Sequence, residues 1–230
     1  VDDTKLFDIG KTVEISAQVA EERGGQKGTL IQAEITALEP DFSANGLTSF
    51  LIRGYDKSNR LHLGRKTRTF TKQSDKQIIQ KIASESGLSA DIDDTGVTYE
   101  YVMQYNQTNM EFMTERAQRI GYQVYAVQDK LYFKKGDAKA KGKTPELAFG
   151  EELRSFRPRM TAAHQASKVQ VLGWDAQKKQ PIKAETQPNK SLNQGGMKKT
   201  GGAIAKSAFG AMEDVIVEYP VETVNEAKAL

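Results

Sequence analysis

Two matched helix signatures in the middle of the 230-residue chain constrain the fold most. One runs from Ser74 to Gly87 and the other from Thr108 to Gly121, so they start 34 positions apart. Each opens with a hydroxyl residue three positions before Gln or Glu, which is the spacing of a capping box. Each ends thirteen residues later with a glycine, where a left-handed residue is favoured. The pattern predicts two short helices and indicates a structural module.

Each predicted helix carries an apolar stripe at helical spacing, as a helix that packs on a sheet requires. The stripes are Ile78, Ile79, Ile82 and Ala83 in the first helix, and Phe112, Met113, Ala117 and Ile120 in the second. We interpret Met110, Phe112 and Met113 as core rather than as a methionine-rich groove. Alternating residues predict a strand at 99–105 and a tight hairpin at 122–133. Residues 67–135 therefore form a small α/β insert.

Residues 11–55 show the alternation of half-buried antiparallel strands. We predict strands at 11–20, 28–39 and 47–55, with turns at Gly24-Gly25 and Asn45-Gly46. Their apolar faces contain Val13, Ile15, Ala17 and Val19, then Ile31, Ala33, Ile35 and Ala37, then Phe50 and Ile52. Such a run is typical of a small barrel or sandwich. Because these faces are too extensive for one thin sheet, we expect them to close with neighbouring subunits.

The last third of the chain returns to strand patterns. We expect three strands and a final helix, at 147–156, 167–174, 215–219 and 225–230. Two polar stretches rich in glycine and lysine, 136–146 and 183–206, interrupt this pattern. We interpret 183–206 as a flexible loop that becomes ordered against an adjacent ring or subunit.

Composition excludes several classes of function. Charged residues make up 27% of the chain and hydrophobic residues 38%, which is ordinary for a soluble globular protein. The apolar runs are too short for a transmembrane helix, so no stable membrane insertion is expected. The absence of cysteine excludes disulfides, a thiol nucleophile and cysteine-ligated zinc. The net charge of +3 indicates a mixed surface, and no nucleic-acid binding is expected.

The residues that could carry catalysis do not form a constellation. His62 and His164 are the only histidines and lie far apart in the sequence, which favours surface or packing roles. The adjacent pairs Glu21-Glu22 and Glu151-Glu152 would point to opposite faces of a strand, so they cannot act as a catalytic dyad. We predict no catalytic, cofactor-binding or metal-ligating residue, and no cofactor.

Three charged or glycine-rich segments have structural interpretations. Asp91, Asp93 and Asp94 lack the spacing of a calcium loop and favour a helix-to-strand connection. The basic connection Lys57–Arg68, which leads into Phe70, favours a solvated or subunit-contacting face over nucleic-acid binding. The stretch 195–202, with four glycines and two lysines, lacks the Walker spacing for a phosphate site.

Several motifs follow one another in order over roughly residues 10–180. They are Ile35–Phe42, Leu51–Leu61, Gly64–Phe70, Gln104–Met113, Arg116–Tyr122, Leu131–Phe133, Leu153–Pro158 and Val171–Asp175. This series resembles the hub region of phage late-control D proteins, which also occurs in the VgrG spike proteins of contractile injection systems. A single short motif could arise by chance, but the ordered series is specific.

The resemblance implies an α+β fold in which tube-type antiparallel β-barrels carry a small α/β insert of two capped helices and a hairpin. It implies a first, N-terminally incomplete barrel segment at 1–66, the insert at 67–146, and a second barrel segment at 147–230 with the flexible loop 183–206. Three copies would form a pseudo-sixfold ring that connects the hexameric tail tube to the spike.

The leading hypothesis is a non-enzymatic hub subunit, assembled in the bacterial cytoplasm and carried in a phage virion or a contractile injection particle such as a type VI secretion system. Its implied partners are two further copies, the tail tube protein, a spike or spike-tip protein and other baseplate proteins. Two alternatives stay open: a tail-associated cell-wall-processing protein whose enzymatic domain lies outside this segment, and a basic nucleic-acid-binding module.

Overall fold

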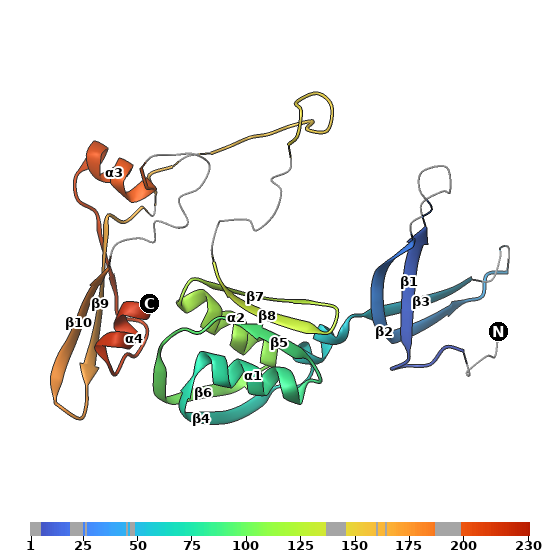
Figure 1. The fold of residues 1–230 in the computed structure, drawn as a ribbon, viewed down its shortest axis with the longest axis horizontal. Helices are drawn as coiled ribbons and strands as arrows, with labels where there is room; N and C mark the ends of the chain where they lie inside the picture. The colour runs from blue at the N-terminus through green and yellow to red at the C-terminus, as the bar shows by residue number, and fades with distance from the viewer. Residues whose placement is uncertain are drawn as a thin grey trace. The chain divides into compact units, whose positions relative to one another are not determined.

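The computed structural model describes residues 6–18, 25, 27–44, 46, 49–136, 146–159, 161–163, 165–186 and 199–230. The chain divides into two compact units, a first unit of residues 1–134 and a second unit of residues 135–230. Strands predominate and helices are few in both, so the fold class is α+β, as predicted (Figure 1). Within the described residues no sheet closes into a barrel, so the tube-type barrels stay a prediction. The division into three segments likewise stays a prediction.

A three-stranded antiparallel sheet, here called the N-terminal sheet, opens the first unit (Figure 1, blue). Its strands are β1 (Thr12–Gln18), β2 (Lys27–Asp41) and β3 (Ser49–Tyr55), in the order β1-β2-β3. They confirm the three strands predicted from the alternation. The prediction for Ala37 was wrong, because a bulge between Ile35 and Ala37 reverses the alternation and moves Ala37 to the other face.

The rest of the first unit is the α/β insert. In chain order it contains the 3₁₀ helix η2 (Lys57–His62), β4 (Lys66–Ser74), α1 (Asp75–Glu85), β5 (Ser89–Ile92), β6 (Thr98–Gln107), α2 (Asn109–Arg119), β7 (Tyr122–Val127) and β8 (Lys130–Lys135). β4 pairs with β6, and a second sheet has the order β5-β8-β7. α1 packs against β4 and β5, and α2 packs against β6 and β7. The helices, β6 and the hairpin were predicted, whereas β4 and β5 were expected to be connections.

Both predicted capping boxes are present. Ser74 Oγ accepts a hydrogen bond from the Gln77 N–H at 3.4 Å, and Gln77 Oε1 accepts one from the Ser74 N–H at 2.9 Å. The same exchange joins Thr108 and Glu111, at 3.1 Å and 2.9 Å. The glycine after each helix has a positive φ, 72° after α1 and 67° after α2, which a residue with a Cβ adopts at a cost. The local sequence therefore sets both helix boundaries.

Replacing the cap of α2 should have a modest, measurable effect. Thr108→Ala leaves the Glu111 N–H without its side-chain acceptor, and we expect the free energy of unfolding to fall by about 1 kcal/mol. Urea denaturation would measure this change. Thr114→Ala in the interior of the same helix is the control, and it should be neutral because alanine has the higher helix propensity. Equal effects of the two variants would contradict the role of the cap.

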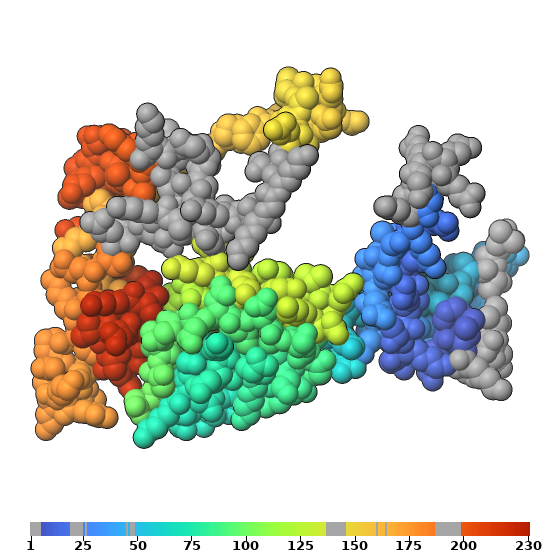
Figure 2. All heavy atoms as spheres, viewed as in Figure 1, coloured from blue at the N-terminus to red at the C-terminus, as the bar shows by residue number. Residues whose placement is uncertain are grey.

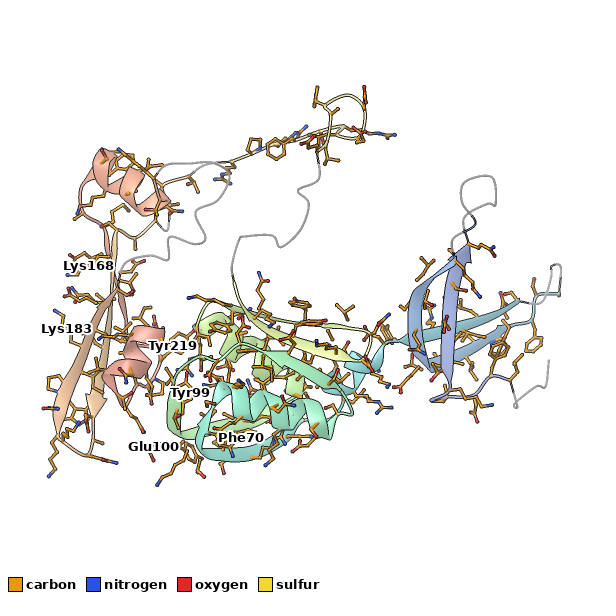
Figure 3. The ribbon with its side chains drawn as sticks, in the orientation of Figure 1. Phe70, Tyr99, Glu100, Lys168, Lys183 and Tyr219 are labelled. Atoms are coloured by element: carbon orange, nitrogen blue, oxygen red, sulfur yellow. The ribbon has the colours of Figure 1, made fainter. Side chains whose placement is uncertain are left out.

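The apolar stripes of the two helices meet in one core. Ile78, Ile79, Ile82 and Ala83 are all 0% exposed, and the stripe of α2 is similarly buried up to Ala117. Phe70 of β4 (labelled in Figure 3) stacks on Phe112 with ring centroids 5.8 Å apart. Leu131 and Phe133 of β8 belong to the same cluster. The insert is accordingly a closely packed body (Figure 2, green).

The second unit is built on the central strand β9 (Lys168–Asp175). β9 pairs antiparallel with β10 (Gln180–Thr186) and parallel with β11 (Glu213–Ile216), in the order β10-β9-β11. The helix α4 (Val224–Ala229) packs against β9 and β10. The unit's core consists of Val171, Ile182, Ala184, Val221 and Ala227. These elements confirm the strands predicted at 167–174 and 215–219 and the final helix, although β11 ends earlier than expected.

The predicted flexible loop 183–206 was wrong at both of its ends. Residues 183–186 belong to β10, because Ile182 and Ala184 alternate into the core. Residues 201–206 belong to the helix α3 (Gly201–Phe209), whose cap Thr200 accepts a hydrogen bond from the Ala203 N–H at 3.2 Å. The middle of the predicted loop, 187–198, lies outside the described residues.

The strand predicted at 147–156 was also wrong. A turn with a single bridge between Phe149 and Leu153 takes its place. From 154 to 159 the chain has no regular structure, and no described strand pairs with it. Most of the other predicted mobile stretch, 136–146, lies outside the described residues.

A close approach in the second unit requires a glycine. A Cβ at Gly173 would lie 2.2 Å from Val221 Cγ2 and 2.8 Å from the Val221 carbonyl oxygen. We expect Gly173→Ala to lower the free energy of unfolding by about 1–3 kcal/mol through overpacking. Gly28→Ala, where a Cβ would meet nothing within 4 Å, is the control and should leave denaturation unchanged. An unchanged Gly173→Ala variant would show that Val221 moves aside freely.

Candidate assembly surface

One face of the N-terminal sheet is apolar across all three strands. Residues directly opposite each other in an antiparallel pair share a face, and side chains alternate along each strand. The register therefore collects on one face, here called the apolar face, Val13, Ile15, Ile31, Ala33, Ile35, Leu38, Phe50 and Ile52. Ile15 lies opposite Ile31, which makes a direct apolar cross-strand pair.

Much of this apolar face is open to solvent. Ile15 is 53% exposed and its partner Ile31 is 42% exposed, whereas Ala33 and Ile35 are buried. Phe50 is 36% exposed and touches Phe7, with ring centroids 6.2 Å apart. Within the first unit, neither α1 nor α2 packs against this sheet (Figure 1). An isoleucine pair in the middle of a sheet face is normally buried, so the face has the character of an interface.

The opposite face of the same sheet is mainly polar. Arg53 of β3 forms a fork with Glu39 of β2, at 2.6 Å and 3.3 Å. The hydrogen bond from Arg53 holds the pKa of the Glu39 carboxyl below its ordinary value. Thr29 donates a hydrogen bond to Glu14 at 2.8 Å. Such a contrast is typical of an antiparallel sheet with one solvated face and one packed face.

Both edges of the N-terminal sheet are unpaired in the described chain. β1 and β3 are the outer strands, and each has one side without a neighbouring strand. β3 reads Ser-Phe-Leu-Ile-Arg-Gly-Tyr, so neither a proline nor a lysine blocks its edge. Unblocked edges present free N–H and C=O groups that can pair with another strand.

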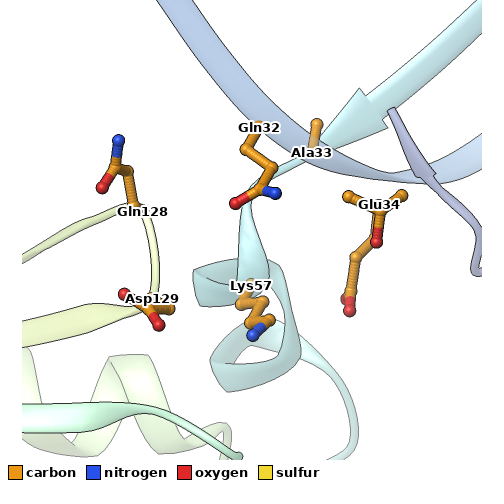
Figure 4. A pocket seen from close by; sticks show the side chains of 7 residues that line it. Gln32, Ala33, Glu34, Lys57, Gln128 and Asp129 are labelled. Atoms are coloured by element: carbon orange, nitrogen blue, oxygen red, sulfur yellow. The ribbon is translucent and has the colours of Figure 1, made fainter. Parts of the chain in front are cut away.

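A small polar cavity lies where the N-terminal sheet meets the insert. It has a volume of about 90 Å³ and is lined from β2, η2 and the turn between β7 and β8, by Gln32, Ala33, Glu34, Lys57, Gln128 and Asp129, together with Thr12 (Figure 4). Beside it Arg60 Nε donates to Glu34 Oε2 at 3.0 Å. Ligand sites usually exceed about 300 Å³, so this cavity is too small for a typical ligand. We interpret it as a packing gap between the sheet and the insert.

The basic connection Lys57–Arg68 is largely neutralised within the chain. Arg60 pairs with Glu34, and Arg65 pairs with Glu111 at 3.1 Å. Lys66 and Arg68 both pair with Glu85, at 3.6 Å and 2.5 Å. Burial opposes ionisation of Glu85, yet the hydrogen bond from Arg68 and the two charges keep its pKa below its ordinary value. Four of the cluster's cations are thus engaged internally, which leaves less positive charge for an external polyanion.

Of the two histidines, the structure describes His62. His62 is exposed at the end of η2, on a concavity of about 500 Å³ that also contains Tyr55 and Asp56. The Asp56 carboxylate caps η2 by accepting from the Ser58 N–H at 3.0 Å. His164 lies outside the described residues. Of the two glutamate pairs, Glu21-Glu22 also lies outside them and Glu151-Glu152 is exposed in a turn.

Two of the three aspartates near β5, Asp91 and Asp93, are paired with lysine, and Asp94 accepts a hydrogen bond from the Gly96 N–H at 2.9 Å. Lys134 Nζ lies 2.5 Å from Asp91 Oδ1 and 2.9 Å from Asp93 Oδ1. The hydrogen bond from Lys134 lowers the pKa of Asp91, and the bonds to both aspartates raise the pKa of Lys134. The described residues contain no group of three or more side chains placed to hold a metal ion. Asp91 and Asp93 therefore act as a structural salt bridge on the outer face of β5 and β8.

A buried ionic cluster was missed by the sequence reasoning. Asp75, the first residue of α1, is 0% exposed and is paired with Arg116 of α2, which is 7% exposed. The Arg116 guanidinium carbon lies 4.4 Å from the centroid of the Tyr99 ring (labelled in Figure 3). Burial, reinforced by the Asp75 charge, raises the pKa of Tyr99. The available signal was Arg116 itself, which falls inside the apolar stripe of α2.

A family model described as the Alg8 N-terminal domain matches residues 1–209. No curated protein matches the chain. Among solved structures, the 43 kDa tail protein of prophage MuSo2 from Shewanella oneidensis is similar, with a TM-score of 0.52 and 16% identity over 94% of this chain and 66% of that one. A tail protein from Neisseria meningitidis MC58 has a TM-score of 0.47 and 12% identity over 87% of this chain and 59% of that one.

A further structure, the E. coli c3393 protein, is described as a component of the type VI secretion system. Its TM-score is 0.41, with 15% identity over 57% of this chain and 43% of that one. The chain thus spans 66% or less of each of these proteins. It shares its fold with the prophage MuSo2 tail protein. The late-control D and VgrG hub family itself is not confirmed, because the matching family model carries a different description.

Among the described residues no helix is long and apolar enough to cross a membrane.

Proposed function

We propose that this chain, which belongs to the family of Alg8 N-terminal domains, is a structural subunit of a phage tail or contractile injection particle. In this proposal it acts as a baseplate hub, with three copies in a pseudo-sixfold ring between the hexameric tail tube and the spike. The observation that carries the proposal is the half-exposed apolar face of the N-terminal sheet with its two unpaired edges. The fold shared with a prophage tail protein supports it.

The physical basis is the removal of exposed apolar surface and open edges. A lone three-stranded sheet with the Ile15–Ile31 pair in water loses the stabilisation that burial of this pair would give. A closed ring of copies covers the apolar faces and pairs the edges, leaving no free strand to recruit further chains. The mechanism is geometric, and in this proposal the segment itself has no enzymatic role.

The proposal is tested by a charge placed on the apolar face. In the intact protein, Ile15→Lys should shift the trimer to the monomer in size-exclusion chromatography with light scattering, because the ring would have to bury the new charge. Ser16→Lys, on the opposite face of the same strand, is the matched control and should stay trimeric. Ser16→Lys should unfold like the parent, whereas Ile15→Lys should unfold at lower denaturant because it has lost the stabilisation that assembly gives. Trimeric Ile15→Lys would overturn the proposed use of this face.

The partners that follow from this proposal are the tail tube protein, a spike or spike-tip protein and other baseplate proteins. Co-purification of the tail tube protein with the parent, and its loss with Ile15→Lys, would support the first of these. The alternative of a cell-wall-processing tail protein predicts that the intact protein reduces the turbidity of a peptidoglycan suspension. The internal pairing of the 57–68 cations argues against the nucleic-acid alternative.

A further inference from the structure

The segment Leu153–Arg159, here called the arginine arm, is extended and solvent-exposed. It reads Leu-Arg-Ser-Phe-Arg-Pro-Arg and contains three arginines and no acid. Phe156 in its centre is 72% exposed. Within the described chain, residues 154–159 take part in no hydrogen bond, ion pair or ring contact. An extended segment with a solvent-exposed phenylalanine and three positive charges is able to pair as a strand with another chain.

The second unit contains an edge of opposite charge. β11 is the outer strand of the sheet β10-β9-β11, and one of its sides is unpaired in the described chain. The run Glu213–Glu218 carries three acids and no base. Val215 is 50% exposed and shares a face with Leu172 and Trp174, which are 37% and 56% exposed. The edge therefore combines negative charge with an uncovered apolar strip.

The outer strands of the N-terminal sheet and β10 fit the arm less well. β3 carries Arg53, which would repel the arm's arginines, and β1 offers the single acid Glu14. β10 carries Lys183 and also Pro181, whose nitrogen cannot donate to a ladder. The Glu185 carboxylate of β10 already forms ion pairs with Lys168 and Lys183 (labelled in Figure 3), at 3.1 Å and 3.3 Å, so it is less available to an arginine of the arm. On β11, Glu213 is held more loosely, by Lys168 at 3.8 Å and Gln170 at 3.4 Å, and no proline interrupts the strand, so among these edges we favour β11.

We propose that the arginine arm of one copy adds as a strand to the free edge of β11 in a second copy. Its alternation places Arg154 and Phe156 on one face and Arg157 on the other, so Phe156 covers Val215 while the arginines meet the acids of β11. The nitrogen of Pro158 then lies on the outer side of the added strand. Because proline has no N–H, a further strand cannot form a complete ladder there. This inference rests on the proposed assembly and names one of its contacts.

The absence of cysteine from the chain makes the contact testable by disulfide trapping. Phe156→Cys and Val215→Cys chains with different tags would be co-expressed in the intact protein and mildly oxidised. We expect most chains to form a disulfide between the two tags, with only background linkage when either variant is expressed alone. Pairing Phe156→Cys with Lys183→Cys is the control, because Lys183 lies on the opposite edge strand, and it should stay at background.

Two outcomes would overturn the inference. One is a linkage between Phe156→Cys and Val215→Cys no higher than with the Lys183→Cys control. The other is a disulfide that forms within single chains carrying both substitutions, which would place the arm on its own sheet. Native mass spectrometry of the same samples separates the two proposals: trimers without the linkage refute the arm contact alone, whereas monomers refute the assembly.

Discussion

Replacing Arg116 with methionine should cost about 3–5 kcal/mol of unfolding free energy, because it leaves a buried carboxylate without its counter-charge. Asp75 is 0% exposed; Arg116 donates to its Oδ1 atom, and its Oδ2 atom has no hydrogen-bond partner within the described chain. Buried at this position it cannot reach water, and the neutral Tyr99 hydroxyl beside it cannot replace the lost positive charge. Urea denaturation followed by circular dichroism would measure the loss.

A second substitution and a control make this expectation specific. Adding Asp75→Leu to Arg116→Met should recover much of the lost stability, because a buried ion pair replaced by apolar residues is often neutral. A coupling energy below about 0.5 kcal/mol in this double-mutant cycle would contradict the account. Arg53→Met is the control, since Arg53 and Glu39 are about half exposed, and its unfolding should match that of the parent.

Removing the centre of the α1 stripe should have the second large effect. Ile82 is 0% exposed in the core of the insert, and Ile82→Ala should lower the free energy of unfolding by about 2–5 kcal/mol. The range reflects the lost transfer energy and the cavity left behind. Ile9→Ala makes the same chemical change at a residue that is 59% exposed, and it should leave the denaturation midpoint unchanged. A neutral Ile82→Ala would mean that the stripe is not a core.

The insert's helices were predictable because their signals are local. The hydroxyl cap, the acceptor three residues later and the closing glycine all lie within one helix and its flanks. The apolar stripes then predicted the buried faces correctly up to Ala117. Alternation likewise predicted β1, β2 and β3, because one face of each of these strands is apolar.

The elements that were missed have misleading local sequence. β4 carries Lys66, Arg68 and Lys72, and its basic character hid a strand whose place is fixed by pairing with β6. α3 begins with two glycines, which normally disfavour a helix. Here a Cβ at Gly202 would lie 2.1 Å from the Ala166 carbonyl oxygen, so a tertiary contact requires the glycine. Such contacts lie far apart in sequence and leave no periodic signal.

The sequence predicted most of the residues that form the candidate surface, but it did not predict whether that surface is buried or exposed. The alternation predicted an apolar face at residues 11–55, and the structure places Ile15 opposite Ile31 as that pattern requires. Whether such a face is covered depends on what lies beside it in space, which a single strand pattern does not encode. The structure adds that the face stays half exposed and that, among the described strands, β1 and β3 have no partner on their outer sides.

The mass of the intact, unmodified protein in solution tests the central claim most directly. Native mass spectrometry at micromolar concentration and near-physiological salt should show a species of three copies, with no series of larger oligomers, because a closed ring leaves no free edge. A stable monomer or dimer across the same concentrations would contradict the proposal that the apolar face of the N-terminal sheet serves assembly.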